Sequence, residues 1–227
     1  MLLLIETSQT TCSVALASDT DIILQYVNHE PMQHATCLPT YIQQTLDYAR
    51  ERRLTIEAVA ISGGPGSYTG LRIGVSTAKG IAYALHIPLI AVDTLQIMAL
   101  QMIKLSSPAP GTLICPMIDA RRMEVYTAIY DYQGNLVGAP QARIVDAGSY
   151  SDIDSSHKII FGGNGAAKCQ PVITRPQCYW LDNIDPTAHQ MLPIAIDLFK
   201  RNKTVDAAYY EPFYLKEFQA TTPKKTI

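Results

Sequence analysis

Short apolar stretches separated by polar turns open the chain, over residues 2–7, 12–17 and 21–28. Apolar runs of this length between turn residues are typical of strands, and their short connections indicate an antiparallel meander. The apolar period then changes to that of a helix between residues 33 and 53. The residues on its predicted apolar face are Leu38, Tyr41, Ile42, Thr45, Leu46 and Ala49.

Strands and helices alternate in the next part of the chain. The pattern predicts strands over 58–62 and 89–92, a helix over 71–85 and a second helix ending near Lys104. Because a strand–helix–strand order requires a crossover connection, these strands are predicted to be parallel. The Ser- and Pro-rich stretch 106–111 is the best linker, so we expect lobes over 1–105 and 106–227.

The second lobe is predicted to begin with strands over 113–118, 123–132 and 136–145, followed by one over 158–161. Gly134-Asn135 is a hairpin turn signal. Asp185-Pro186 predicts the start of a helix that reaches Asn202 and bends at Pro193. The polar segment after Tyr214 is predicted to be a mobile tail. The fold class is therefore α/β, with two lobes of mixed sheet flanked by helices.

Composition narrows the class of protein. Of 227 residues, 48% are apolar and 17% charged, enough apolar residues for a large core, and the net charge of −2 gives no basic excess for gripping RNA alone. The apolar N-terminus is too short for a signal peptide and no run reaches membrane length, so we expect a cytoplasmic protein. The five cysteines include no Cys-x-x-Cys pair, which favours buried thiols over disulfides or zinc.

A glycine-rich segment, Gly-Gly-Pro-Gly-Ser-Tyr-Thr-Gly, joins a predicted strand to a predicted helix over residues 63–70. Glycines at such a joint let backbone amides approach an anion at the helix N-terminus. No Gly-Lys-Ser/Thr follows, so it is not a nucleoside-triphosphate P-loop. An anion-binding loop and a tight structural turn both fit the residues.

Small residues recur every four positions in the helix after this turn, at Gly70, Gly74, Ala78 and Ala82. Glycine inside a helix costs roughly 1 kcal/mol relative to alanine, so Gly74 and Gly80 call for a packing explanation. The stripe allows another helix to approach closely. That helix can belong to the same chain, as residues 38–49, or to a partner.

The usual catalytic signatures are incomplete. Phosphotransferases of the two-lobed ASKHA class open with Asp-x-Gly-Thr, whereas this chain has Glu6-Thr7-Ser8. No glycine follows Asp119, which leaves a structural ion pair with Arg121 or a ligand role. The five histidines form no His-x-x-x-His pair, and Ser67 lacks a Gly-x-Ser-x-Gly context, so metal and serine hydrolases are disfavoured.

Several stretches together resemble one family, TsaB (YeaZ). The matching stretches are Ile5-Glu6-Thr7-Ser8, residues 12–16, His34 with Leu38-Pro39, residues 64–74, residues 118–121 with 124–126, residues 191–195, and Glu211-Pro212 with Tyr214-Leu215. The block Gly-Pro-Gly-Ser-Tyr-Thr-Gly-Leu-Arg-Ile-Gly and the Asp-Ala-Arg block are the specific ones. The resemblance spans almost the whole chain and is least in residues 136–185.

The resemblance implies an ASKHA pseudo-enzyme, with two ribonuclease-H-like lobes, that pairs with its catalytic paralogue TsaD. TsaD transfers threonylcarbamoyl to N6 of adenosine 37 in tRNA, and the ATPase TsaE joins the pair. This chain would contact tRNA through the complex, touch no membrane, and form a homodimer when alone. It would have no catalytic residue, metal or cofactor of its own, with ATP or ADP near the partner interface in the complex only. An ATP-dependent ASKHA phosphotransferase and a glycoprotease-like metallohydrolase are the rivals.

Two sets of residues are predicted to carry this role. The partner interface is expected at Leu38, Tyr41, Ile42, Thr45, Gly70, Leu71, Gly74, Val75, Ala78 and Ala82. A nucleotide-binding or purely structural loop is expected at Thr7, Ser8, Gly64, Gly66, Ser67 and Arg72.

Overall fold

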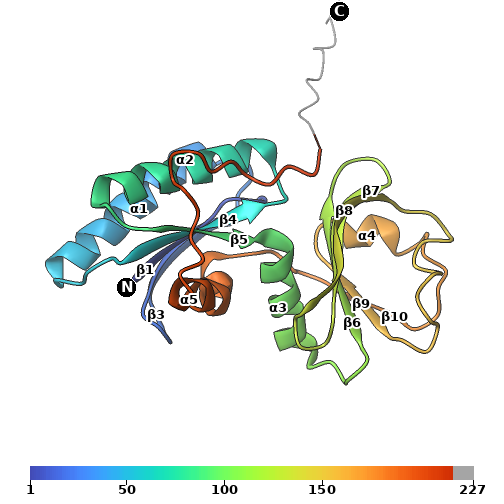
Figure 1. The fold of residues 1–227 in the computed structure, drawn as a ribbon. Coiled ribbons are helices and arrows are strands. Elements are labelled where there is room, and N and C mark those ends of the chain that lie inside the picture. Colours follow the sequence, from blue (N-terminus) through green and yellow to red (C-terminus); the bar gives the residue numbers. More distant parts are fainter. Residues whose placement is uncertain (217–227) are drawn as a thin grey trace, which may run out of the picture.

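The computed structural model describes residues 1–216, so most of the predicted mobile tail after Tyr214 lies outside the described residues. The chain forms two lobes, each built on a five-stranded mixed sheet (Figure 1). In the first sheet the order is β3-β2-β1-β4-β5, with an antiparallel meander followed by parallel strands, as the sequence predicts. Its strands are β1 (Leu2–Glu6), β2 (Cys12–Ala17), β3 (Ile22–Asn28), β4 (Ala58–Gly64) and β5 (Leu89–Asp93).

Helices cover both faces of the first sheet (Figure 1). On one face lie α1 (His34–Glu51) and α2 (Tyr68–Leu85), packed with Leu3 and Ile5 of β1. Leu2 and Leu4 point to the other face, where η1 (Ala188–Met191) and α5 (Leu192–Lys200) lie. Every residue of β1 is buried because this central strand is covered on both sides, which explains its continuous apolar run.

The second sheet has the order β10-β9-β6-β7-β8 and repeats the plan of the first. Its strands are β6 (Leu113–Asp119), β7 (Glu124–Tyr130), β8 (Leu136–Ile144), β9 (Ile159–Gly162) and β10 (Cys178–Leu181). Strands β6 to β8 are antiparallel, and β9 and β10 run parallel to β6. The sequence did not predict β10 or the four-residue helix α4 (Ala166–Cys169).

Helix α3 (Thr94–Ser106) lies between the two sheets and joins the lobes (Figure 1). Its residues Leu95, Met98 and Met102 are fully buried in one apolar cluster with Ile114 and Ala128 of the second sheet. Asp93 caps the helix by accepting a hydrogen bond from the backbone N–H of Gln96 at 2.9 Å.

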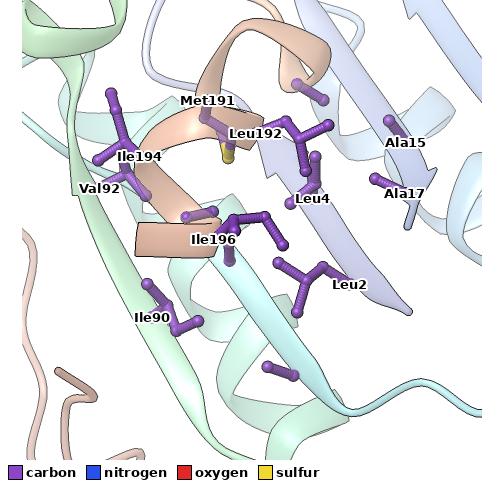
Figure 2. Packing of buried hydrophobic residues seen from close by; sticks show 14 of the residues in the cluster. Leu2, Leu4, Ala15, Ala17, Ile90, Val92, Met191, Leu192, Ile194 and Ile196 are labelled. Carbon is purple, nitrogen blue, oxygen red and sulfur yellow. The ribbon is translucent and has the colours of Figure 1, made fainter. Parts of the chain in front are cut away.

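The C-terminal helix differs from the prediction in its extent and position. It begins at Leu192, after a 3₁₀ turn, instead of at Asp185-Pro186. Pro193 therefore lies in the first turn, where its missing N–H has no helical acceptor, and it causes no internal bend. Ile194 and Ile196 pack against the first sheet with Leu4 (Figure 2). The helix belongs by packing to the first lobe, and its assignment to the lobe 106–227 is wrong.

Two glycines of α2, one buried and one exposed, give a matched test of packing. A Cβ atom at Gly74 would lie 2.0 Å from Thr7 Oγ1, whereas a Cβ at Gly80 would meet nothing within 4 Å. We expect Gly74→Ala to lower the free energy of unfolding by about 1–3 kcal/mol through overpacking. Gly80→Ala should raise it by about 0.5–1 kcal/mol through helix propensity. Urea unfolding of the isolated chain measures both, and equal effects of the two substitutions would contradict this packing.

Candidate functional site

A cleft of about 1320 Å³ lies between the two lobes. The first lobe contributes the β1–β2 turn, with Ser8 and Gln9, and the glycine turn that leads into α2. The second lobe contributes the β6–β7 turn, including Asp119 and Arg122. The β1–β2 turn and the β6–β7 turn each follow the first strand of their sheet, and they lie on opposite walls of the cleft.

The glycine turn is pressed against the β1–β2 turn. A Cβ atom at Gly66 would lie 2.2 Å from the Ser8 carbonyl oxygen, and one at Gly70 would lie 2.2 Å from the Thr7 carbonyl oxygen. The Ser67 N–H donates to the Ser8 carbonyl at 2.6 Å, and the Gly70 N–H donates to the Ser67 hydroxyl at 3.3 Å. Both amides therefore have internal acceptors, which favours the structural reading of this turn over an anion cradle.

A buried carboxyl group lies beneath the two turns. Glu6 is fully buried; one of its oxygens accepts from the Ser8 N–H at 2.6 Å, and the other has no partner among the described residues. Burial raises the pKa of Glu6 to about 7, against the lowering effect of the backbone hydrogen bond from Ser8. Glu6 does not line the cleft, so it cannot place a carboxylate there.

Three polar side chains on the cleft wall of the first lobe carry buried atoms without a hydrogen-bond partner among the described residues. They are the Ser8 hydroxyl, the Gln9 side-chain carbonyl and His34 Nε2. Gln9 also donates to the sulfur of Met98 at 3.2 Å, which links the wall to α3. Gln9 gives no signal in the sequence, since a glutamine in a turn carries no distinguishing pattern.

The β6–β7 turn is held by a lysine that sequence reasoning missed. The Asp119 carboxylate accepts from the Arg121 N–H at 2.8 Å and forms an ion pair with Lys168. Lys168 also donates to the carbonyls of Arg122 and Glu124, each at 2.7 Å. The structural role predicted for Asp119 is present, but its cation is Lys168 and not the Arg121 guanidinium. The spacing of 49 residues between Asp119 and Lys168 gave no signal.

The predicted interface residues lie on the wrong side of their helices. Leu38, Thr45, Leu71 and Ala78 have no exposed surface, and the remaining buried members line the same inner face. These remaining members are Ile42, Gly70, Gly74, Val75 and Ala82. They contact the sheet and the β1–β2 turn of their own chain, and of them Gly70 alone also lines the cleft. Only Tyr41 is partly exposed, and its ring stacks on Tyr26 at 5.3 Å.

The predicted loop residues are divided between the cleft and other places. Ser8, Gly66 and Ser67 line the cleft. Thr7 and Gly64 are buried outside it, and Gly64 has a φ of 106°, a conformation that favours glycine. Arg72 is exposed and does not line the cleft; its guanidinium lies 4.5 Å from the centre of the ring of Tyr68, which does.

Cysteines and acidic or histidine side chains form no further centre in residues 1–216. All five cysteines are free; Cys12, Cys115 and Cys169 are buried, and Cys37 and Cys178 are partly exposed. Burial raises the pKa of Cys115 to about 11, so this thiol is protonated at neutral pH. Within the same residues, no three His, Cys, Asp or Glu side chains are grouped as metal ligands. No helix there has the length and apolar content to cross a membrane.

Known proteins give a consistent match to this fold and site. The model of the family "TsaD: tRNA N6-adenosine threonylcarbamoyltransferase" matches residues 29–160. The tRNA threonylcarbamoyladenosine biosynthesis protein TsaB of Escherichia coli is 30% identical, over 95% of this chain and 94% of that protein. TsaB of Bacillus subtilis is 33% identical over 60% of this chain, and that match spans 57% of the Bacillus protein.

Solved structures agree with the sequence relatives. A Pseudomonas aeruginosa protein described as similar to the peptidase YeaZ superposes with a TM-score of 0.80 at 28% identity, covering 95% of this chain and 99% of that one. YeaZ from the same organism superposes with a TM-score of 0.78 at 28% identity. The two sheets, the central cleft and these likenesses define a two-lobed α/β protein of the ASKHA class. Within that class, the chain belongs to the TsaB (YeaZ) branch of the family described by the TsaD model.

The raised pKa of Glu6 predicts how the stability of the folded chain depends on pH. Its pKa is raised from 4.5 to about 7 in the folded chain, so folding favours the protonated form. The stabilisation is fully present below pH 4.5 and is lost as the pH rises through about 7. We expect Glu6→Gln, which keeps the acceptor for Ser8, to remove this slope and to be more stable than wild type at pH 8 by up to about 3 kcal/mol. Chemical unfolding from pH 5 to 8 measures it, and an unchanged slope in the variant would refute it.

Proposed function

We propose that this chain is the non-catalytic, activating subunit of the complex that forms threonylcarbamoyladenosine at position 37 of tRNA. Its partner is the catalytic paralogue TsaD. Membership of the TsaB family supports a role in the biosynthesis of threonylcarbamoyladenosine in tRNA. The observation that carries the subunit role is the glycine turn of the cleft, which packs on Thr7 and Ser8 and directs the Ser67 and Gly70 amides to acceptors within the chain.

The chemistry of the cleft favours a silent subunit over the two rival enzymes. A phosphotransferase needs free backbone amides and a carboxylate beside the phosphates, but Ser67 N–H and Gly70 N–H are engaged and Glu6 is buried outside the cleft. The Asp119 carboxylate, on the opposite wall, is neutralised by Lys168. A metallohydrolase needs a ligand set, which the sequence does not offer in any recognisable spacing.

The partner surface is assigned to the outer faces of α1 and α2, in place of the inner residues selected from the sequence. Ser76, Gly80 and Ala84 follow one another at intervals of four on the exposed side of α2, beside Ile73 and Thr77. The outer side of α1 adds uncharged Thr36, Thr40, Gln43 and Gln44. The two helices lie next to each other on one face of the sheet (Figure 1). Because TsaD shares the family model, its equivalent helices can pair with these into a four-helix layer.

The remaining components of the proposed complex are TsaE and tRNA. We assign TsaE and tRNA to the assembled complex, since the net charge of −2 gives this chain little electrostatic attraction for RNA by itself. When TsaD is absent, the same smooth helix pair supports a homodimer. A cytoplasmic location fits a role in tRNA modification.

The chain has no cofactor of its own in this proposal, and ATP or ADP binds near the partner interface in the complex only. Arg121 and Arg122 are exposed on one wall of the cleft, and Ser8 and His34 on the other wall offer unpaired polar atoms. These groups can hold phosphate oxygens from the two walls. The Ser67 and Gly70 amides are already bonded within the chain, so in this proposal the partner supplies further charge or donors.

A substitution at Gly80 tests the partner surface without disturbing the folded core. The isolated Gly80→Arg variant should keep or slightly raise its unfolding temperature, since the position is exposed and arginine is a better helix former. In a desolvated helix interface the unpaired charge should weaken binding to TsaD by about 3 kcal/mol or more, over 100-fold. Calorimetric titration with TsaD measures it. Gly80→Ala and Ala167→Arg, a charge added on exposed α4, are the controls that should bind normally. Wild-type binding by Gly80→Arg would place the interface elsewhere.

An activity assay of the isolated chain distinguishes the proposed non-catalytic subunit from the two rival enzymes. With tRNA and threonylcarbamoyl adenylate supplied, the chain alone should give no modified adenosine above the uncatalysed level. Addition of TsaD should give turnover that depends on this chain. The lone chain should bind Mg-ATP more weakly than about 1 mM by calorimetry, because the cleft amides are engaged. Micromolar ATP binding with phosphate transfer would instead favour an ASKHA kinase.

A further inference from the structure

The last described segment of the chain, residues 205–216, crosses from one lobe to the other, and we name it the C-terminal strap. Figure 1 shows it leaving α5, passing over α2 and ending beside the second lobe. It begins on the first sheet, where the Val205 N–H donates to the Leu89 carbonyl at 2.9 Å. It contains only one isolated β-bridge and no helix, so side chains and single hydrogen bonds hold it in place.

Lys79 of α2 anchors the middle of the strap. Its ammonium group donates to the carbonyl oxygens of Ala208 at 3.1 Å and Tyr210 at 3.0 Å. Because Lys79 contacts only backbone carbonyl oxygens of the strap, it fixes the path of the strap and does not select particular side chains there. The anchor lies on the flank of α2, beside its inner face.

The next part of the strap lies on the glycine turn. The Gly63 carbonyl accepts from the Phe213 N–H at 2.7 Å and from the Tyr210 hydroxyl at 3.5 Å. A Cβ atom at Gly64 would lie 2.5 Å from the Phe213 carbonyl oxygen, so the turn and the strap are in direct backbone contact. The strap therefore covers the side of the turn that faces away from Ser8.

The end of the strap reaches the cleft and the second lobe. The Tyr214 ring lies 5.0 Å from the ring of Tyr68, at the start of α2. Two residues later, Lys216 lines the cleft and forms an ion pair with Glu124 of β7, whose side chain is 15% exposed. Glu124 also anchors the β6–β7 turn, because its carbonyl accepts from Lys168. A single segment thus joins both turns that form the walls of the cleft.

We propose that the C-terminal strap is a clasp that holds the two lobes together across the cleft. When Lys216 is docked on Glu124, the strap fixes the glycine turn and the β6–β7 turn relative to each other. When it is undocked, the lobes are joined by α3 and by residues 182–187, which connect β10 of the second lobe to η1 of the first, and the cleft can widen. The proposal concerns the isolated chain and does not depend on the function of the complex.

Hydrogen exchange of the isolated full chain tests the clasp, because exchange rates of protected amides report local opening. We expect Lys216→Gln to speed exchange about two- to fivefold in both walls, residues 64–70 and 119–125, as loss of one partly exposed ion pair allows. The pair exchanged in sign, Lys216→Glu with Glu124→Lys, should return the rates toward wild type. Lys203→Gln, a neutralised exposed lysine just before the strap, is the control and should leave both walls unchanged.

Lys79→Met provides the stronger variant, since it keeps the apolar stem and removes both carbonyl contacts. It should speed exchange in residues 208–216 and, through the clasp, in residues 119–125 of the other lobe. If the strap loosens while residues 119–125 exchange at the wild-type rate, the strap is only a surface segment of the first lobe and the proposal is wrong. Equal effects of Lys203→Gln and Lys216→Gln would also overturn it, because net charge and not the pair would then be responsible.

Discussion

The close approach of the glycine turn to the end of β1 is the constraint on which the rest of the structure depends. Gly66, Gly70 and Gly74 each leave no room for a side chain against Thr7 and Ser8. This contact seats the first half of α2 on the sheet and places its small-residue stripe inside the chain. It also uses amides that would otherwise face the cleft, so the packing of the lobe and the loss of a phosphate cradle have one physical origin.

The same contact explains why polar groups are buried at this point. A turn pressed onto the end of a strand takes Glu6 and its neighbours out of water. Glu6 keeps one hydrogen bond to Ser8 and has a raised pKa, which lessens the cost of burying a charge. The lobe thus retains a carboxyl at the position where a phosphotransferase would use one, but in an environment that favours its neutral form.

The sequence predicted most of the fold and little of the site. The meander, the parallel β4 and β5, and both helices of the first lobe follow from periods that extend over whole elements. The inner face of α2 was recognised as a stripe of small residues, but such a pattern does not say which surface it meets. In the structure Gly70 and Gly74 meet Thr7, and Ala78 and Ala82 pack in the apolar core of the same lobe. Lys168 and Gln9 were missed because their partners are distant in sequence and their roles depend on folded geometry.

The return of α5 to the first lobe has a consequence for how the chain can be made. Leu2, Leu4 and Ile90 are covered only when residues 188–200 arrive, after the whole second lobe has been synthesised. Until then the growing first lobe exposes an apolar sheet face on the ribosome, which makes it a target for chaperones and for aggregation. For the same reason, a fragment ending near residue 105 would lack the helix that covers one face of its own sheet, so the first lobe is not expected to fold without the rest of the chain.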